Sequence, residues 1–282
     1  MLFDVSHTTS YVYSKAVFLE PHIVRLRPRC DATQHLIDFS LTATPRPSGR
    51  SEYLNLDGNS VSQLWFDGLT DHLEIVTAFS VETLQTNPFD YLISNPSVLK
   101  LPMRYPSALA PGVTPYLGKS ETKIEAVEKF AKKIADEAGW EPIPFLSALV
   151  HRLSRDWKQI VREEGDPLPS SITLDRLEGS CRDITQLFLD ACRALGLATR
   201  FVSGYQEGDP IQEIRYLHEW AEVYILGGGW RGYDPTLGLA VSNRHIAVAA
   251  GRTHQSVSPV SGAFRGSDVQ AVFYANITMG LR

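Results

Sequence analysis

The 282-residue sequence predicts an α+β fold, in which an N-terminal β-sandwich precedes a domain of helices packed on an antiparallel sheet. Three observations predict it. Short segments with period-two alternation fill the first ninety or so residues, three helical patterns follow residue 119, and strand-like segments return from residue 198. Helices first and strands afterwards are typical of an α+β domain. We predict a β-domain at residues 1–95, a proline-rich connector at 96–118 and a second domain at 119–282.

The predicted strands of the β-domain rest on alternation of apolar and polar residues. HLIDFSLTATP alternates in this way, and LEIVTAFSVET repeats the pattern. Asp57-Gly58-Asn59 lies between two such runs and is typical of a turn. Several short strands without helical periodicity favour a β-sandwich. The side chains expected on one face are Ile37, Phe39, Leu41 and Ala43 in the first run and Leu73, Ile75, Thr77, Phe79 and Val81 in the second.

Three amphipathic helices are expected after the connector, which carries six prolines between residues 88 and 115. Ser120 is expected to cap the first helix, and Gly139 to end it. The third lies in EGSCRDITQLFLDACRALG, and the strands ATRFVSGY, LHEWAEVYI, WRGYDP and DVQAVFYA come later. The apolar stripes are Ile124, Val127, Phe130, Ile134 and Ala138 in the first helix, Leu146, Leu149, Val150, Leu153, Trp157, Ile160 and Val161 in the second, and Ile184, Leu187, Phe188, Ala191, Cys192 and Leu195 in the third.

Composition and charge narrow the class of protein. The apolar content of 43% is enough for a sizeable core, and the net charge of −5 argues weakly against a nucleic-acid or membrane partner. The N-terminus lacks a basic region followed by an apolar run, so no signal peptide is expected, and no apolar run approaches ~18 residues. The odd number of cysteines, at positions 30, 181 and 192, does not suggest a disulfide framework. A cytoplasmic location fits best.

Cys181 is the first candidate for chemistry, because it opens the third helix behind Gly179 and Ser180. A helix N-terminus lowers the pKa of a thiol and offers its backbone N–H groups to an oxyanion. Taken alone, however, a free cysteine is more often a small buried side chain. Cys192 lies on the apolar stripe of the same helix and is expected in the core, and Cys30 has no visible partner.

A cysteine nucleophile needs a base, and the base needs an orienting group. His218 stands out among eight histidines, because YLHEWAEVYILGGGWRGYDPT is typical of a strand, a glycine turn and a returning strand that carries Asp234. Alternation puts Trp220 on the same face as His218. A turn centred on Leu226 would set Asp234 opposite His218, and one centred on Gly227-Gly228 would shift it by three residues. A lone strand histidine is more often structural, but the ensemble of three residues favours a catalytic site.

GSCRDITQLFLDACRALGLATRFVSGY followed by HEWAEVYILGGGWRGYDPT resembles the bacterial transglutaminase-like superfamily. The tail GRTHQSVSPVSGAFRG is similar to the C-terminal segment of that family, and RLRPR with LDGNSV is similar to its N-terminal β-domain. The resemblance implies a papain-like core with Cys181 as nucleophile, His218 as general base and acid, and Asp234 orienting His218. Ser180 stands where valine is common, which affects substrate preference. Ser180 and Trp220 are the residues predicted to bind substrate.

The predicted function is hydrolysis of a peptide or isopeptide amide through a thioester on Cys181. Transfer of the acyl group to an amine, or a catalytically silent peptide-binding module, are the alternatives. No cofactor is expected. GGGWRG matches a dinucleotide-binding pattern but leads into a strand, and His218 and Glu219 point to opposite faces of a strand, so no metal is implied either. The expected partner is a peptide or protein amide, with neither nucleic acid nor membrane, and the oligomeric state stays open.

Overall fold

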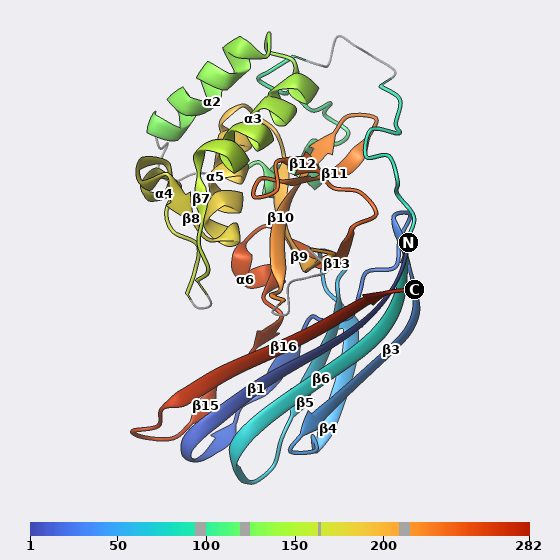
Figure 1. Ribbon diagram of the computed structural model, residues 1–282, viewed down its shortest axis with the longest axis vertical. Coiled ribbons are helices and arrows are strands. Elements are labelled where there is room, and N and C mark those ends of the chain that lie inside the picture. Colours follow the sequence, from blue (N-terminus) through green and yellow to red (C-terminus); the bar gives the residue numbers. More distant parts are fainter. Residues whose placement is uncertain (94–99, 119–124, 163–164, 209–214) are drawn as a thin grey trace.

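The chain folds into a β-sandwich and a helix-and-sheet unit that lie one above the other (Figure 1). This architecture is a computed structural model that describes residues 1–93, 100–118, 125–162, 165–208 and 215–282. The predicted α+β class, with β-structure before a core of helices on an antiparallel sheet, is confirmed.

The sandwich consists of a five-stranded and a four-stranded antiparallel sheet. The first has the order β15-β1-β6-β3 with β16 also paired to β1, and comprises β1 (Leu2–Leu19), β3 (Gln34–Thr44), β6 (Leu69–Thr83), β15 (Phe264–Arg265) and β16 (Ala271–Leu281). The second has the order β14-β2-β5-β4, and comprises β2 (His22–Val24), β4 (Gly49–Leu54), β5 (Ser60–Trp65) and β14 (Val260–Ser261). As predicted, Leu73, Ile75, Thr77, Phe79 and Val81 of β6 are all buried.

The alternation predicted for β3 is right beyond residue 38 and wrong at Ile37. Leu36 pairs with Val81 and Asp38 with Ser80, so that Ile37 is an extra residue in a bulge. The side chain of Ile37 is 55% exposed, whereas that of Leu36 packs against the core. A bulge resets the two-residue period, and the alternation alone does not reveal one.

The last strand corrects the predicted extent of the second domain. Residues 119–282 were assigned to that domain, but β16 runs antiparallel along β1, from Phe3 opposite Leu281 to Tyr13 opposite Ala271. The two termini therefore lie side by side (Figure 1). A period-two segment can pair with any open strand edge, and the sequence does not say which edge is open. The boundaries at residues 95 and 118 stay predictions.

The upper unit in Figure 1 packs helices on one antiparallel sheet of order β12-β11-β10-β9-β13. Its core is built around α5 and the strands beneath it. No helix in the described part of the chain is long and apolar enough to span a membrane. The strands are β9 (Thr199–Gln206), β10 (His218–Ile225), β11 (Gly229–Asp234), β12 (Leu239–Ala240) and β13 (His245–Gly251), and the main helices are α2 (Glu125–Glu137), α3 (Pro142–Asp156), α4 (Ser170–Arg176), α5 (Cys181–Ala194) and α6 (His254–Val257). Shorter elements are α1 (Ala110–Val113), η2 (Thr114–Tyr116), β7 (Lys158–Gln159) and β8 (Glu178–Gly179).

The predicted start of the first helix lies outside the described residues, and the second helix ends earlier than predicted. The expected cap Ser120 and the apolar Ile124 lie outside the described residues. The stripe predicted for the second helix extends too far, because α3 ends at Asp156 and β7 begins two residues later. Val161 is consequently 68% exposed.

Candidate active site

Cys181 is the first residue of α5, and a buried carboxylate fixes the backbone just before it. Ser180 donates its backbone N–H to Oδ2 of Asp183 at 2.8 Å and its hydroxyl at 2.6 Å. Oδ1 of Asp183 accepts from the N–H of Leu168 at 2.7 Å and pairs with Arg162. Burial raises the pKa of Asp183, but these donors outweigh it and hold the pKa below its usual value. Asp183 was missed in the sequence, although Ser-x-x-Asp ahead of an apolar run is a capping signature.

His218 and Asp234 meet across the β10–β11 hairpin. Ala221 pairs with Tyr233 and Ile225 with Gly229, so the turn is centred on Gly227 and the register falls between the two that were considered. Asp234 therefore meets His218 diagonally rather than directly opposite. The Nε2–H of His218 donates to Oδ2 of Asp234 at 2.7 Å.

Asp234 is fully buried and both of its oxygens accept hydrogen bonds. Oδ1 accepts from the hydroxyl of Thr236 at 2.6 Å and from the backbone N–H groups of Thr236 and Leu237 at 3.0 and 3.2 Å. Oδ2 accepts from His218 and also from Nε2 of His245 at 3.0 Å. Burial opposes the charge, but the two histidines outweigh it and hold the pKa of Asp234 well below its usual range.

The imidazole of His218 interacts with Cys181 as well as with Asp234. Burial favours the neutral imidazole, yet the Asp234 carboxylate and the nearby side chain of Cys181 raise the pKa of His218 well above its usual range. Since Asp234 engages Nε2, Nδ1 is the nitrogen left for the thiol. Cys181 is partly exposed, so a substrate can reach it. The structure thus brings the three predicted catalytic residues together.

The two residues predicted to bind substrate are buried. The hydroxyl of Ser180 is committed to Asp183. Trp220 is 1% exposed, and its ring stacks on that of His218 with the centroids 6.2 Å apart. The contacts of these side chains are therefore those of a helix cap and of a support behind the imidazole, not of a surface that meets substrate.

The other two cysteines lie away from this group. Cys192 is fully buried in the helical core, as predicted. Cys30 is exposed, and its sulfur lies 3.9 Å from Nδ1 of His35, a partner that the sequence did not suggest.

His245 is the site residue that the sequence reasoning missed. It begins β13, eleven positions after Asp234, and no motif or spacing marked it. Its Nε2, Oδ2 of Asp234 and Nε2 of His218 lie within 4.8 Å of one another. Three such atoms can hold a metal ion, but the contacts of 2.7 and 3.0 Å are donor–acceptor lengths, and we describe the three side chains as a hydrogen-bonded group.

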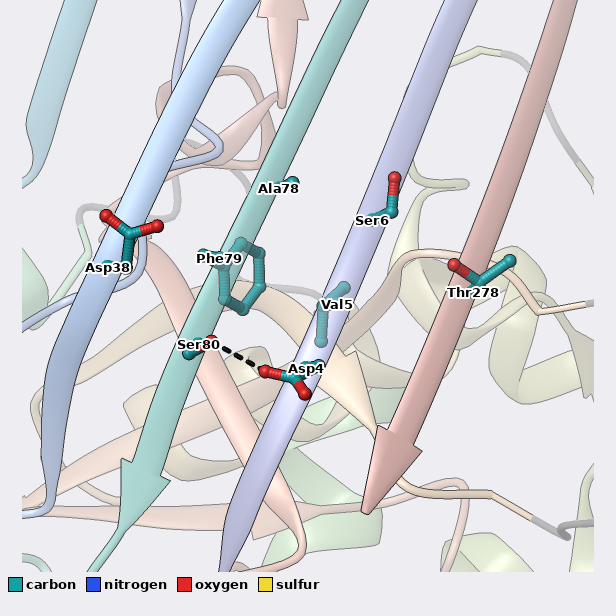
Figure 2. Close-up of a pocket in the computed structure, with 8 residues that line it drawn as sticks. All are labelled: Asp4, Val5, Ser6, Asp38, Ala78, Phe79, Ser80 and Thr278. Carbon is teal, nitrogen blue, oxygen red and sulfur yellow. Dashed lines mark hydrogen bonds between the residues drawn. The ribbon is translucent and has the colours of Figure 1, made fainter. Parts of the chain in front are cut away.

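A hollow of about 290 Å³ lies elsewhere, on the five-stranded sheet (Figure 2). It is lined from β1, β3, β6 and β16, and its one drawn hydrogen bond joins the hydroxyl of Ser80 to Oδ1 of Asp4 at 2.6 Å. None of the residues that line it belongs to the group around Cys181.

A thiol at a helix N-terminus, facing a histidine and an aspartate on a hairpin, defines a class of α+β proteins with a cysteine-centred site. Residues 117–235 match the family model of the transglutaminase-like superfamily, and residues 3–82 match that of the bacterial transglutaminase-like N-terminal region. Together the two matches cover more than half of the chain. Residues 117–235 thus belong to the transglutaminase-like superfamily, as the motifs of this segment predict.

Relatives of similar length are known in mycobacteria. The uncharacterized protein Rv2569c of Mycobacterium tuberculosis is 29% identical over 279 residues, which cover 92% of this chain and 86% of the relative. The uncharacterized protein ML0607 of Mycobacterium leprae is 27% identical over 274 residues, with coverage of 93% and 92%. The crystal structure of a candidate cysteine protease from Cytophaga hutchinsonii has a TM-score of 0.68 and 19% identity, over 99% of this chain and 90% of that chain. This likeness concerns the fold alone.

Proposed function

We propose that this protein is a cysteine-dependent amide-bond hydrolase of the peptidase or isopeptidase kind, with Cys181, His218 and Asp234 as its catalytic residues. One observation carries the proposal. His218 is held by Asp234 at 2.7 Å while it also interacts with a partly exposed thiol at the start of α5. Membership of the transglutaminase-like superfamily supports a nucleophilic thiol.

In the acylation step, the Cys181 thiolate attacks the carbonyl carbon of the amide, and a C–S bond forms as the carbonyl becomes an oxyanion. The N–H groups of the first turn of α5 have no partner within the helix, so the N–H of Cys181 is available to that oxyanion. The Nδ1–H of protonated His218 gives its proton to the leaving nitrogen. The C–N bond then breaks, leaving an amine and a thioester on Cys181.

In the deacylation step, neutral His218 takes a proton from water at Nδ1, and the resulting hydroxide adds to the thioester carbonyl. The C–S bond breaks, which releases a carboxylic acid and restores the thiolate beside protonated His218. Throughout both steps Asp234 accepts the hydrogen bond from the Nε2–H of His218. It thereby fixes the orientation of the ring and stabilises the imidazolium.

The test is turnover of a peptide library with and without an excess of a labelled primary amine. New amino termini or free carboxylates that require Cys181 support hydrolysis, and Cys181→Ala should abolish them. Cys192→Ala is the matched control, because it removes a thiol from the same helix in the core. Dominant incorporation of the amine would instead make the protein an acyl transferase. Binding of peptides without turnover, while Cys181 can still be alkylated, would favour the silent peptide-binding module.

We also propose that the protein acts in the cytoplasm. Cys30, Cys181 and Cys192 are all free thiols, which suits a reducing compartment and a catalytic thiol that must stay reduced. Cell fractionation with an antibody against the protein tests this. Recovery in the membrane fraction, or in a fraction from an oxidising compartment, would contradict the cytoplasmic location.

A further inference from the structure

His245 contacts the same oxygen of Asp234 that holds His218. Its Nε2 lies 3.0 Å from Oδ2 of Asp234, and Nε2 of His218 lies 2.7 Å from that oxygen. His245 is 5% exposed and reaches Asp234 from β13, at the edge of the sheet. His245 takes no part in the acylation and deacylation steps, although it contacts Asp234 of the site.

The direction of this hydrogen bond follows from the chemistry of its two ends. An ionised carboxylate only accepts, so Nε2 of His245 must carry the proton. Nδ1 of His245 is buried and has no hydrogen-bond partner in the described part of the chain. With the proton on Nε2, that buried atom is an unpaired acceptor rather than an unpaired N–H donor. The neutral tautomer that donates to Asp234 is therefore the one that this environment accommodates.

Asp234 does not depend on His245 for its position. Its other oxygen, Oδ1, is already anchored by the hydroxyl and N–H of Thr236 and by the N–H of Leu237. What His245 changes is the availability of Oδ2. Two donors share one oxygen, and each withdraws negative charge from the other's hydrogen bond.

We propose that His245 is a positioning residue of the active site, which donates a hydrogen bond to Oδ2 of Asp234 in competition with His218. The competition limits how strongly the Asp234 carboxylate stabilises the protonated ring of His218. This role rests on the proposed catalytic function of His218. It means that the thiolate–imidazolium pair is tuned from β13, a strand that carries none of the three catalytic residues.

Other titratable groups on the surrounding elements have partners of their own. His218 itself faces Cys181 on α5 and Asp234 on β11, and His245 faces Asp234. The remaining charged or titratable neighbours pair as Arg200 with Glu222, Glu207 with Arg244, His254 with Glu219, and Tyr205 with His7. The shared Oδ2 is therefore the polar link between His245 and His218. The ring of Trp220 packs against both, with its centroid 6.2 Å from that of His218 and 5.2 Å from that of His245, and it carries no charge.

Replacing His245 by a side chain without a donor should raise the pKa of His218 further. With no competing donor, Oδ2 carries more negative charge and stabilises the imidazolium more. A hydrogen bond of ordinary strength corresponds to a shift of about half to one pH unit. The pH above which the imidazolium of the thiolate–imidazolium pair loses its proton should rise by the same amount.

The experiment is an NMR titration of the His218 ring in protein labelled at histidine, which needs no substrate. His245→Met removes the donor, and His245→Gln keeps an N–H that can reach Oδ2. We expect His218 to titrate about half to one pH unit higher in His245→Met than in the wild type, and close to the wild-type value in His245→Gln. Alkylation of Cys181 across the same pH range should show the same shift.

The matched control is His7→Met. His7 is another buried histidine, hydrogen-bonded to Tyr205 at 2.8 Å, and burial lowers its pKa to about 4. It makes no contact with Asp234, so its loss should leave the titration of His218 unchanged. An unmoved or lowered midpoint in His245→Met, or an equal shift in His7→Met, would overturn the proposal.

The wild-type protein supplies a second measurement if His245→Met does not fold. Long-range ¹⁵N correlations report which ring nitrogen of His245 carries the proton. A proton on Nε2 supports the proposal, and a proton on Nδ1 alone would refute it. Because none of these readouts uses turnover, the proposal can hold even if no amide is hydrolysed. Turnover without the shift would leave the catalytic function standing and this role refuted.

Discussion

Two cysteines on one helix have opposite surroundings. Cys181 lies partly exposed in the first turn of α5, close to the imidazole of His218. Cys192 lies about three turns further along, fully buried, and burial raises the pKa of its thiol well above the usual value. From these surroundings we expect the two sulfurs of this helix to differ in reactivity.

Alkylation at pH 6 should therefore distinguish them. We expect a limiting amount of iodoacetamide to modify Cys181 and to leave Cys192 unmodified, as measured by peptide mass mapping. His218→Gln should slow the labelling of Cys181 by about 10²-fold or more, since the imidazolium that stabilises the thiolate is lost. Cys30 is exposed and serves as the internal reference for an accessible thiol outside the site. Equal labelling of all three would contradict this reading.

The His218–Asp234 pair also makes stability depend on pH in a defined direction. The pKa of His218 is raised on folding, so its contribution is complete below about pH 6.5 and is lost as the pH rises through the folded-state value. The pKa of Asp234 is lowered on folding, so its contribution is present above about pH 4 and is lost as the pH falls. Both contributions are complete only between these limits.

Denaturant unfolding from pH 4 to 10 should show this difference between wild type and His218→Gln. The stability advantage of the wild type should be largest between about pH 4 and 6.5 and should shrink toward higher pH. His72→Gln is the control, because His72 is a half-exposed histidine beside Asp71 on the sandwich. An advantage that grows with increasing pH would show that His218 is not held as an imidazolium.

At the scale of elements, Gly204 of β9 leaves room for atoms of the two strands that flank β9, β10 and β13. Gly204 of β9 lies opposite His218. A Cβ at this position would lie 2.0 Å from the carbonyl oxygen of Ile246 and 2.7 Å from the ring of Trp220. A methyl group at this position would therefore collide with Ile246, the residue after His245, and with the Trp220 ring that stacks on His218.

Gly204→Ala should consequently destabilise the protein by about 1–3 kcal/mol and reduce turnover more than the loss of fold explains. Thermal unfolding gives the first quantity, and kcat at a temperature where both proteins are folded gives the second. Gly280→Ala is the matched control, since Gly280 also lies in a strand but has open space around its Cα. If Gly204→Ala were as stable as the wild type, the flanking strands could move away from residue 204 without a cost in the free energy of unfolding.

Sequence reasoning found the elements whose signals are local and missed what depends on pairing between distant strands. Cys181, His218 and Asp234 were predicted because a helix cap and a hairpin are read from neighbouring residues. The bulge at Ile37 and the pairing of β16 with β1 depend on which edges meet, which no short window contains. His245 belongs to the second kind, because only the β9–β13 pairing brings it to Asp234.

At the scale of the whole molecule, the sandwich completes the open edge of the sheet that carries His218 and Asp234. Two side-chain amides pair with the backbone of β13 as a neighbouring strand would. Asn59 accepts from the N–H of Ala250 at 2.8 Å and donates to its carbonyl at 2.7 Å. Gln34 does the same at Ala247, with both contacts at 2.9 Å. Since β13 also carries His245, the sandwich supports the site through this edge.

Removing these two amides together should therefore weaken catalysis without touching the site. In Gln34→Ala with Asn59→Ala, four hydrogen bonds to the backbone of β13 are lost. The carbonyl of Ala247 keeps the N–H of Arg29 at 3.0 Å, so the N–H of Ala247 and both backbone groups of Ala250 are left unpaired, and each such buried group costs about 1–3 kcal/mol. We expect earlier unfolding, faster amide exchange along β13 and a lower kcat/KM. Gln255→Ala is the control, because that amide bonds Asp166 at the exposed surface. If amide exchange at Ala247 and Ala250 stayed as slow as in the wild type, these two amides would not be what holds β13, and the support of His245 would have to come from the pairing with β9 and from the bond of Arg29 to Ala247.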